Sequence, residues 1–255
     1  MARAGVDPVA GVHAGRVGTA GRSERSLWGW WVAANTVGET VGLGATAAVA
    51  VAVAGAGETG RTGAMVAATA ALVAAGAFEG LAVGVAQWSV LRSALTALRA
   101  RRWIVATVVG ALVAWLLGVV PATLGGGAGT AEAPPFGQAV QLVLAAVMGL
   151  VLGPVLGVPQ WRVLRRHVPR ASRWVLANAV AWAAGMPVVF FAAGSVPADA
   201  SPRHIAFVVV AACAAAGAVV GAIHGAWLVR LVRPRLDTAP TRTGGQEPGS
   251  PPHRS

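Results

Sequence analysis

The stretch Gly149–Arg165 reads GLVLGPVLGVPQWRVLR, and it has a close copy upstream in Gly76–Arg92, GAFEGLAVGVAQWSVLR. Both copies follow Gly-x3-Gly-x3-Gly-x2-Gln-Trp-x-Val-Leu-Arg. On a helix, the three glycines and the glutamine of each copy lie within an arc of about 80°. In an apolar helix, such a stripe lets a neighbouring backbone approach closely, which is typical of helix packing in membranes. The stretch therefore predicts packed membrane helices rather than a chemical activity.

The same pattern returns in a weaker form near the end of the chain. There, Gly217 and Gly221 follow Cys213, and His224 takes the place of the glutamine. We therefore expect one glycine stripe in each of three helices to serve helix packing: Gly76, Gly80, Gly84, Gly149, Gly153, Gly157, Gly217 and Gly221.

The apolar segments between these stripes share a second pattern, Trp-x3-Asn/Thr-x2-small-x3-small. It starts at Trp31, Trp103 and Trp174, which are about 70 residues apart. Alternation of the two patterns predicts three tandem helical hairpins of the same orientation, because each unit contains an even number of spans. The expected fold class is an all-α integral membrane protein, with six transmembrane helices in a pseudo-threefold bundle of three repeats at 28–92, 100–165 and 172–233.

These motifs resemble those of an uncharacterised group of bacterial multi-span membrane proteins with repeated Gln-Trp-x-x-Leu-Arg signatures, each followed by a helix that opens with Trp. The signature is carried here by Gln87–Arg92 and Gln160–Arg165. In the third unit, His224 and Gly225 stand in place of Gln-Trp, and Val229 stands at the arginine position. The resemblance implies a membrane location and a repeat fold, and it supplies no catalytic residues.

Composition also places the chain in a bilayer. Of its 255 residues, 56% are hydrophobic and 11% are charged, and the mean hydropathy is +0.65, whereas soluble domains are far more polar. Tails at 1–27 and 234–255 have compositions that predict disorder. Between them, a membrane domain over 28–233 holds six apolar segments long enough to cross a core of about 30 Å: 28–54, 64–91, 103–124, 136–164, 174–194 and 204–232.

The net charge of +11 comes from arginine. All the arginines except Arg61 and Arg203 lie in or next to the two tails and the second and fourth connections between the apolar segments. By the positive-inside rule, this distribution predicts a multi-pass protein of the cell membrane with both termini cytoplasmic. We expect the arginine clusters to contact anionic lipid headgroups rather than nucleic acid.

Most tryptophans lie next to the predicted cytoplasmic ends of the spans. Because tryptophan is enriched where a helix meets the membrane surface, they are expected to form an interfacial belt. The belt would contain Trp28, Trp30, Trp31, Trp88, Trp103, Trp161, Trp174 and Trp227.

Each span also carries one hydrogen-bonding side chain close to this belt. The expected result is a polar layer near the inner boundary of the membrane, made of Asn35, Gln87, Thr107, Gln160, Asn178 and His224. Hydrogen bonds between helices are the simplest role for such a layer. A polar mouth or ligand site is the alternative.

Two acids interrupt the apolar segments. Glu39 and Glu79 are predicted at matching depth on consecutive helices, about 12 Å in from the belt. A carboxylate at that depth costs about 2.5–3.5 kcal/mol, so such residues usually face the interior of a bundle and mark ion or proton paths. The two acids are therefore the candidate ion or proton site, and protonated acids that only bond neighbouring helices are the alternative.

No motif for catalysis, metal binding or cofactor binding accompanies these features. HExxH, Gly-x-Ser-x-Gly and phosphate-binding loops are missing, and the five histidines are scattered. The sequence therefore predicts a membrane protein that is not an enzyme and has no cofactor, most simply a structural or interaction subunit with a membrane-protein partner. The alternative is a small transporter or channel for a cation, proton or small solute that uses the acidic pair.

The arginine distribution yields a topological prediction. In a Cys213→Ala background, a membrane-impermeant thiol reagent added outside cells should label Thr130→Cys and Asp199→Cys, but not Arg99→Cys. Labelling of Arg99→Cys from outside would show that the predicted orientation is wrong.

Overall fold

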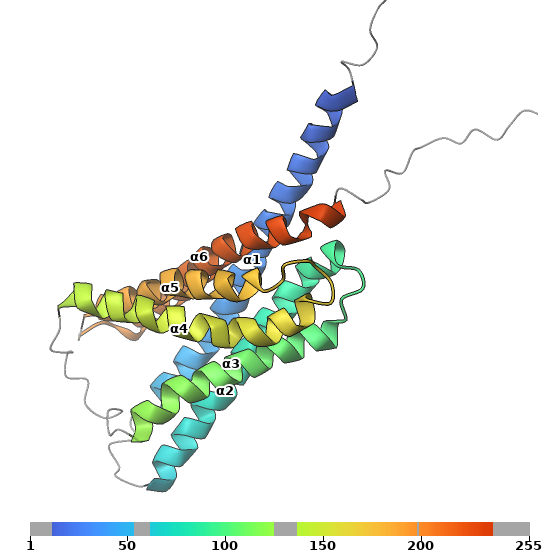
Figure 1. Cartoon of the computed structure of the whole chain (residues 1–255). Coiled ribbons are helices and arrows are strands. Elements are labelled where there is room, and N and C mark those ends of the chain that lie inside the picture. The colour runs from blue at the N-terminus through green and yellow to red at the C-terminus, as the bar shows by residue number, and fades with distance from the viewer. Residues whose placement is uncertain (1–11, 54–61, 125–136, 198, 237–255) are drawn as a thin grey trace, which may run out of the picture.

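The computed structural model describes residues 12–53, 62–124, 137–197 and 199–236, and all of its regular structure is helical (Figure 1). All six helices contain a span long and apolar enough to cross a membrane, which confirms the predicted all-α class and the number of spans. The helices are α1 (Val12–Val53), α2 (Thr62–Ala94), α3 (Ala100–Leu124), α4 (Gln138–Leu164), α5 (Arg173–Gly194) and α6 (Pro202–Leu236).

The helices differ from the predicted segments mainly at the two ends of the chain. Helix α1 begins at Val12, so it extends into the segment predicted as a tail through residue 27. Extending an existing helix costs much less free energy than nucleating a new one, and no proline interrupts residues 12–27. Helix α6 likewise runs on to Leu236. The third connection at 125–136 and the tail from 237 lie outside the described residues.

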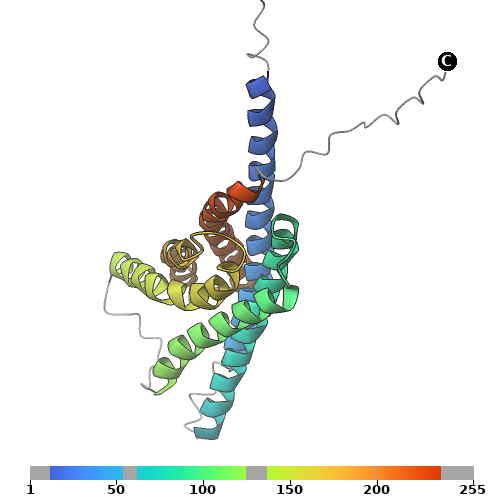
Figure 2. The same ribbon diagram turned by 45° about the vertical axis from the view of Figure 1, so that its right-hand side comes forward.

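The six helices form a ring. Each helix packs against its neighbours in the chain, and α6 closes the ring by packing against α1 (Figures 1 and 2). The ring is tightest between α4 and α5, and its smallest interface joins α3 and α4. These two helices diverge toward the ends that precede and follow residues 125–136 (Figure 2).

The glycine stripes of the even-numbered helices face the next helix along the ring. A methyl group added at Gly80 of α2 would lie 2.8 Å from the Cα of Val108 in α3. At Gly153 of α4 it would lie 2.5 Å from the carbonyl oxygen of Asn178 in α5, and at Gly217 of α6 it would lie 2.8 Å from that of Asn35 in α1. Each stripe therefore allows backbones to touch where a side chain would separate them.

The odd-numbered helices place glycines against the helix on their other side. A methyl group at Gly42 of α1 would lie 2.7 Å from the Cα of Glu79 in α2, and one at Gly110 of α3 would lie 3.0 Å from the carbonyl oxygen of Leu156 in α4. At Gly185 of α5 it would lie 2.6 Å from the side chain of Val220 in α6. Every interface of the ring thus contains a glycine contact.

The hydrophobic core lies at the end of the bundle where the described chain begins and ends. All six helices and the connections after α2 and α4 contribute to it, so both connections lie at this same end. Its buried members are Leu27, Trp31, Leu91, Leu95, Leu98, Trp103, Leu164, Val168, Ala171, Trp174, Ala177, Leu228, Leu231 and Val232.

Three tryptophans occupy the centre of this core. Trp31, Trp103 and Trp174 are fully buried, and Trp174 makes edge contacts with the other two at centroid distances of 5.8 and 6.2 Å. The prediction that all eight tryptophans form an interfacial belt is wrong for these three. Depth along a helix can be estimated from sequence, but these rings point inward, whereas Trp30 is 68% exposed.

The repeated Gln-Trp-x-x-Leu-Arg motif divides its side chains between the inside and the outside of the bundle. The leucines, Leu91 and Leu164, are fully buried. Each arginine folds back over the tryptophan four residues earlier, with the guanidinium 5.4 Å from the ring centroid in both Trp88–Arg92 and Trp161–Arg165. This cation–π contact stabilises the arginine against the helix that carries it.

A glycine-to-alanine pair tests the close contacts. Gly153→Ala should destabilise the protein by about 1–3 kcal/mol, because the added methyl would overlap the α5 backbone. Gly44→Ala is the matched control, since nothing lies within 4 Å of the methyl it adds. The measurement is reversible unfolding in detergent, and equal stability of the two variants would contradict backbone contact at Gly153.

Candidate functional site

The predicted polar layer is buried at the level of the tryptophan core. All six members are at most 5% exposed. Asn35, Thr107 and Asn178 each donate a hydrogen bond to the backbone carbonyl of the tryptophan four residues earlier in their helix, at 2.8, 3.1 and 2.9 Å. These bonds satisfy the shorter polar side chains within their own helices.

The two glutamines connect helices. Gln87 of α2 donates to Asn35 Oδ1 of α1 at 2.9 Å. Gln160 of α4 donates from Nε2 to Gln87 Oε1 at 3.2 Å and to Thr107 Oγ1 of α3 at 3.0 Å. Its Oε1 accepts a bond of 2.8 Å from the indole of Trp174 in α5. One network therefore joins α1 to α5, and Gln160 is its centre.

His224 of α6 lies beside this network without joining it. Its ring stacks on Trp174 with centroids 5.0 Å apart, and neither ring nitrogen has a hydrogen-bond partner among the described residues. Four of the six predicted polar residues, Asn35, Gln87, Thr107 and Gln160, are therefore joined by direct hydrogen bonds. A fifth, Asn178, is connected through the backbone carbonyl of Trp174. The sixth contributes a ring contact.

The two acids are buried at the same level, but their carboxyl groups have different environments. Gly42 of α1, one turn after Glu39, contacts Glu79 of α2. Oε2 of Glu79 accepts a hydrogen bond of 3.0 Å from Nε1 of Trp115 in α3. Glu39 instead packs its Cβ beneath Gly217 of α6, and its Oε2 has no hydrogen-bond partner within the described ranges. No hydrogen bond joins the two acids in the described part of the chain.

A cavity of about 400 Å³ lies next to Glu79, where α3 and α4 diverge. Its volume is within the range of small-molecule sites. Glu79 is the one ionisable residue among the described residues that line it, and Glu39 does not line it. With Glu79 of α2, the wall comes from five helices. Its other members lie in α1, α3, α4 and α5: Leu43, Ala111, Ala114, Trp115, Gly118, Val119, Met148, Gly149, Leu152, Leu156, Trp182, Met186, Val189 and Phe190.

Sequence reasoning missed the aromatic part of this wall. Trp115 and Trp182 are the two tryptophans that lie away from the predicted belt, and both line the cavity. Their position in the middle of apolar segments, far from either membrane surface, was the available signal. Tryptophan there needs a partner for its N–H, and for Trp115 that partner is Glu79.

Within the described residues, no group of three or more His, Cys, Asp or Glu side chains is placed to hold a metal ion. No family model, curated protein or solved structure matches the chain. The cavity beside Glu79 and the buried polar network are therefore the two features from which a function can be argued.

The central position of Gln160 can be tested by a double-mutant cycle. Gln160→Leu should lower the free energy of unfolding by about 1–3 kcal/mol, because it leaves Thr107 and the Trp174 N–H without their partner. Combination with Gln87→Leu should be less than additive, since the two side chains share a bond.

The control cycle pairs Gln160→Leu with Thr69→Val, which removes only a local bond to the Met65 carbonyl. That pair should be additive. Additive behaviour in both cycles, measured by unfolding in mixed micelles, would show that the glutamines act independently.

Proposed function

We propose that this protein binds a lipophilic organic cation, of the size of an aryl-substituted quaternary ammonium ion, in the cavity beside Glu79. The observation that carries the proposal is a single buried carboxyl group at the wall of an otherwise apolar, tryptophan-lined cavity. The protein would act as a small binding protein or carrier in the membrane, without enzymatic chemistry.

The chemistry of the cavity favours this ligand over an inorganic ion. A small metal ion or sodium requires several oxygen ligands, and the described wall offers one carboxyl group. An organic cation needs only one opposite charge, because it interacts with tryptophan faces and apolar surfaces as well. Trp115, Trp182 and Phe190 supply such surfaces.

A bound cation would also offset the cost of the buried charge. A carboxylate in an apolar setting is unfavourable by about 2.5–3.5 kcal/mol unless it has a partner. The indole of Trp115 donates one hydrogen bond to Glu79, and a cation in the cavity would complete the compensation. The sequence-predicted pair is thereby reduced to one binding acid, with Glu39 as its buried neighbour.

We further infer that the bundle consists of three hairpin repeats around a pseudo-threefold axis. The cyclic order of glycine contacts supports this inference, as does the hydrogen bond to the preceding tryptophan carbonyl that recurs in α1, α3 and α5. We also propose that the protein lies in the cell membrane with both termini cytoplasmic. We propose further that it is related to the bacterial membrane proteins with repeated Gln-Trp-x-x-Leu-Arg signatures. They rest on arginine distribution and motif sequence.

The binding proposal is tested with benzyltrimethylammonium and its uncharged carbon isostere, neopentylbenzene. Purified protein should bind the cation saturably in equilibrium dialysis, and Glu79→Gln should weaken that binding at least tenfold. Glutamine preserves side-chain volume and an acceptor for Trp115, so the fold should be kept. Glu39→Gln is the comparison variant, because this neighbouring acid is also buried but does not line the cavity, and it should weaken the binding less than Glu79→Gln does.

Two results would contradict the proposal. One is full binding by Glu79→Gln when its thermal stability is normal, and the other is equally effective competition by neopentylbenzene. In either case, the reading that remains is a structural or interaction subunit, in which the glycine faces serve helix packing and the acids only bond neighbouring helices.

A further inference from the structure

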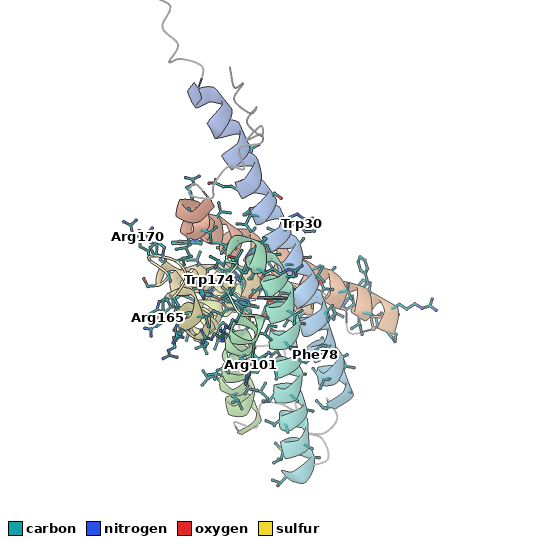
Figure 3. All side chains as sticks on the ribbon, turned by 90° about the vertical axis from the view of Figure 1, so that its right-hand side faces the viewer. Trp30, Phe78, Arg101, Arg165, Arg170 and Trp174 are labelled. Atoms are coloured by element: carbon teal, nitrogen blue, oxygen red, sulfur yellow. The ribbon has the colours of Figure 1, made fainter. Side chains whose placement is uncertain are left out.

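A second cavity, of about 640 Å³, lies at the end of the bundle that holds the connections after α2 and α4. It is formed by the connection between α4 and α5, the first turns of α5 and the last part of α6. Three arginines line it: Arg170, Arg173 and Arg230. The rest of the lining includes Leu176, Trp227 and Leu231. Figure 3 shows Arg170 on the outside of this end, with Trp174 inside the bundle.

The backbone at this site is held in an unfavourable conformation. Arg170 has a φ of 53°, and it is the one non-glycine residue with a positive φ in the described part of the chain. The left-handed conformation is unfavourable for a residue that carries a Cβ atom. Its carbonyl accepts a hydrogen bond of 3.1 Å from the backbone of Arg173, so the turn brings these two arginines to one side of the cavity.

The charges around the cavity are uncompensated. No carboxylate lines it, and none of the three arginines forms an ion pair among the described residues. The carboxylate of Glu24 in α1 already accepts two hydrogen bonds from Arg233. They run from Nε to Oε1 at 2.6 Å and from Nη2 to Oε2 at 2.8 Å. The positive end of the α5 helix dipole adds to the three charges, since its first turn contains no acid. The cavity therefore favours an anion.

The lining also identifies the kind of anion. Guanidinium groups match the geometry of phosphate oxygens. The rest of the lining that matters here is apolar. Leu231 is buried, Trp227 is half-buried, and Leu176 is 52% exposed on the outer surface of α5. A free phosphate would leave this surface uncovered, whereas a phospholipid would cover it with its glycerol and first acyl carbons.

We propose that Arg170, Arg173 and Arg230 form a specific site for the headgroup of an anionic phospholipid, with its glycerol and acyl chain over Trp227 and Leu176. Basic pockets between helices at a membrane surface commonly bind such headgroups. The site shares no lining residue with the Glu79 cavity.

The experiment measures lipid retention and stabilisation in a neutral detergent. Native mass spectrometry should show phosphatidylglycerol retained in preference to phosphatidylcholine, and phosphatidylglycerol should raise the melting temperature where inorganic phosphate at the same concentration does not. The triple variant Arg170→Gln/Arg173→Gln/Arg230→Gln should lower the affinity at least tenfold. The matched control is Arg99→Gln/Arg101→Gln/Arg102→Gln, which removes three arginines from the end of the α2–α3 connection and the first turn of α3 at this end of the bundle and should leave the affinity unchanged.

Arg230→Gln alone provides a second measure if the triple variant does not fold, because Arg230 is an exposed residue within a continuous helix. It should weaken phosphatidylglycerol retention several-fold. Equal losses in both triple variants would show general attraction to surface charge, and equal stabilisation by inorganic phosphate would show a site for free anions. Unchanged retention by Arg230→Gln and by the pocket triple variant would also overturn the proposal.

Discussion

Close contact between helix backbones at glycine is the constraint on which the rest of this structure depends. Each of the six interfaces in the ring contains a glycine whose added methyl group would overlap or crowd the next helix. In a membrane, lipid tails are as apolar as leucine, so helices gain little from burying apolar side chains. Dispersion contacts and hydrogen bonds at short range must hold them together, and glycine makes that range possible.

The buried glutamines depend on this proximity. Gln160 reaches Gln87 across the ring and Thr107 on the adjacent helix because the backbones approach closely at the same level. Their amides need partners in an apolar setting, and each supplies both a donor and an acceptor. The network therefore selects one rotation for each participating helix, whereas glycine stripes alone would tolerate small rotations and shifts.

The cavity beside Glu79 lies where these restraints weaken. The glutamine network and the tryptophan core both lie toward the terminal end of the bundle, and α3 and α4 share the smallest interface. Beyond that level the two helices diverge, and large side chains such as Trp115 and Trp182 line the space between them. A bundle tied firmly at one end can thus keep an internal site at the other without losing its helix order.

Sequence alone determined the six spans, the glycine stripes and the residues that make up the polar layer. These properties are local: apolar length sets the spans, and spacings of three and four residues place side chains on one helical face. The position of Glu39 and Glu79 at one level along α1 and α2 followed from the same counting of residues.

Only the tertiary structure decided which neighbour each face meets. Trp31, Trp103 and Trp174 share the depth of Trp30, but they turn inward to form the core because their faces meet in the centre of the ring. It likewise separated Glu79, which lines a cavity, from Glu39, which packs against α6. All the contacts of a helix together set its rotation about its own axis and its distances to the other helices. The spacing of residues within one helix does not specify either.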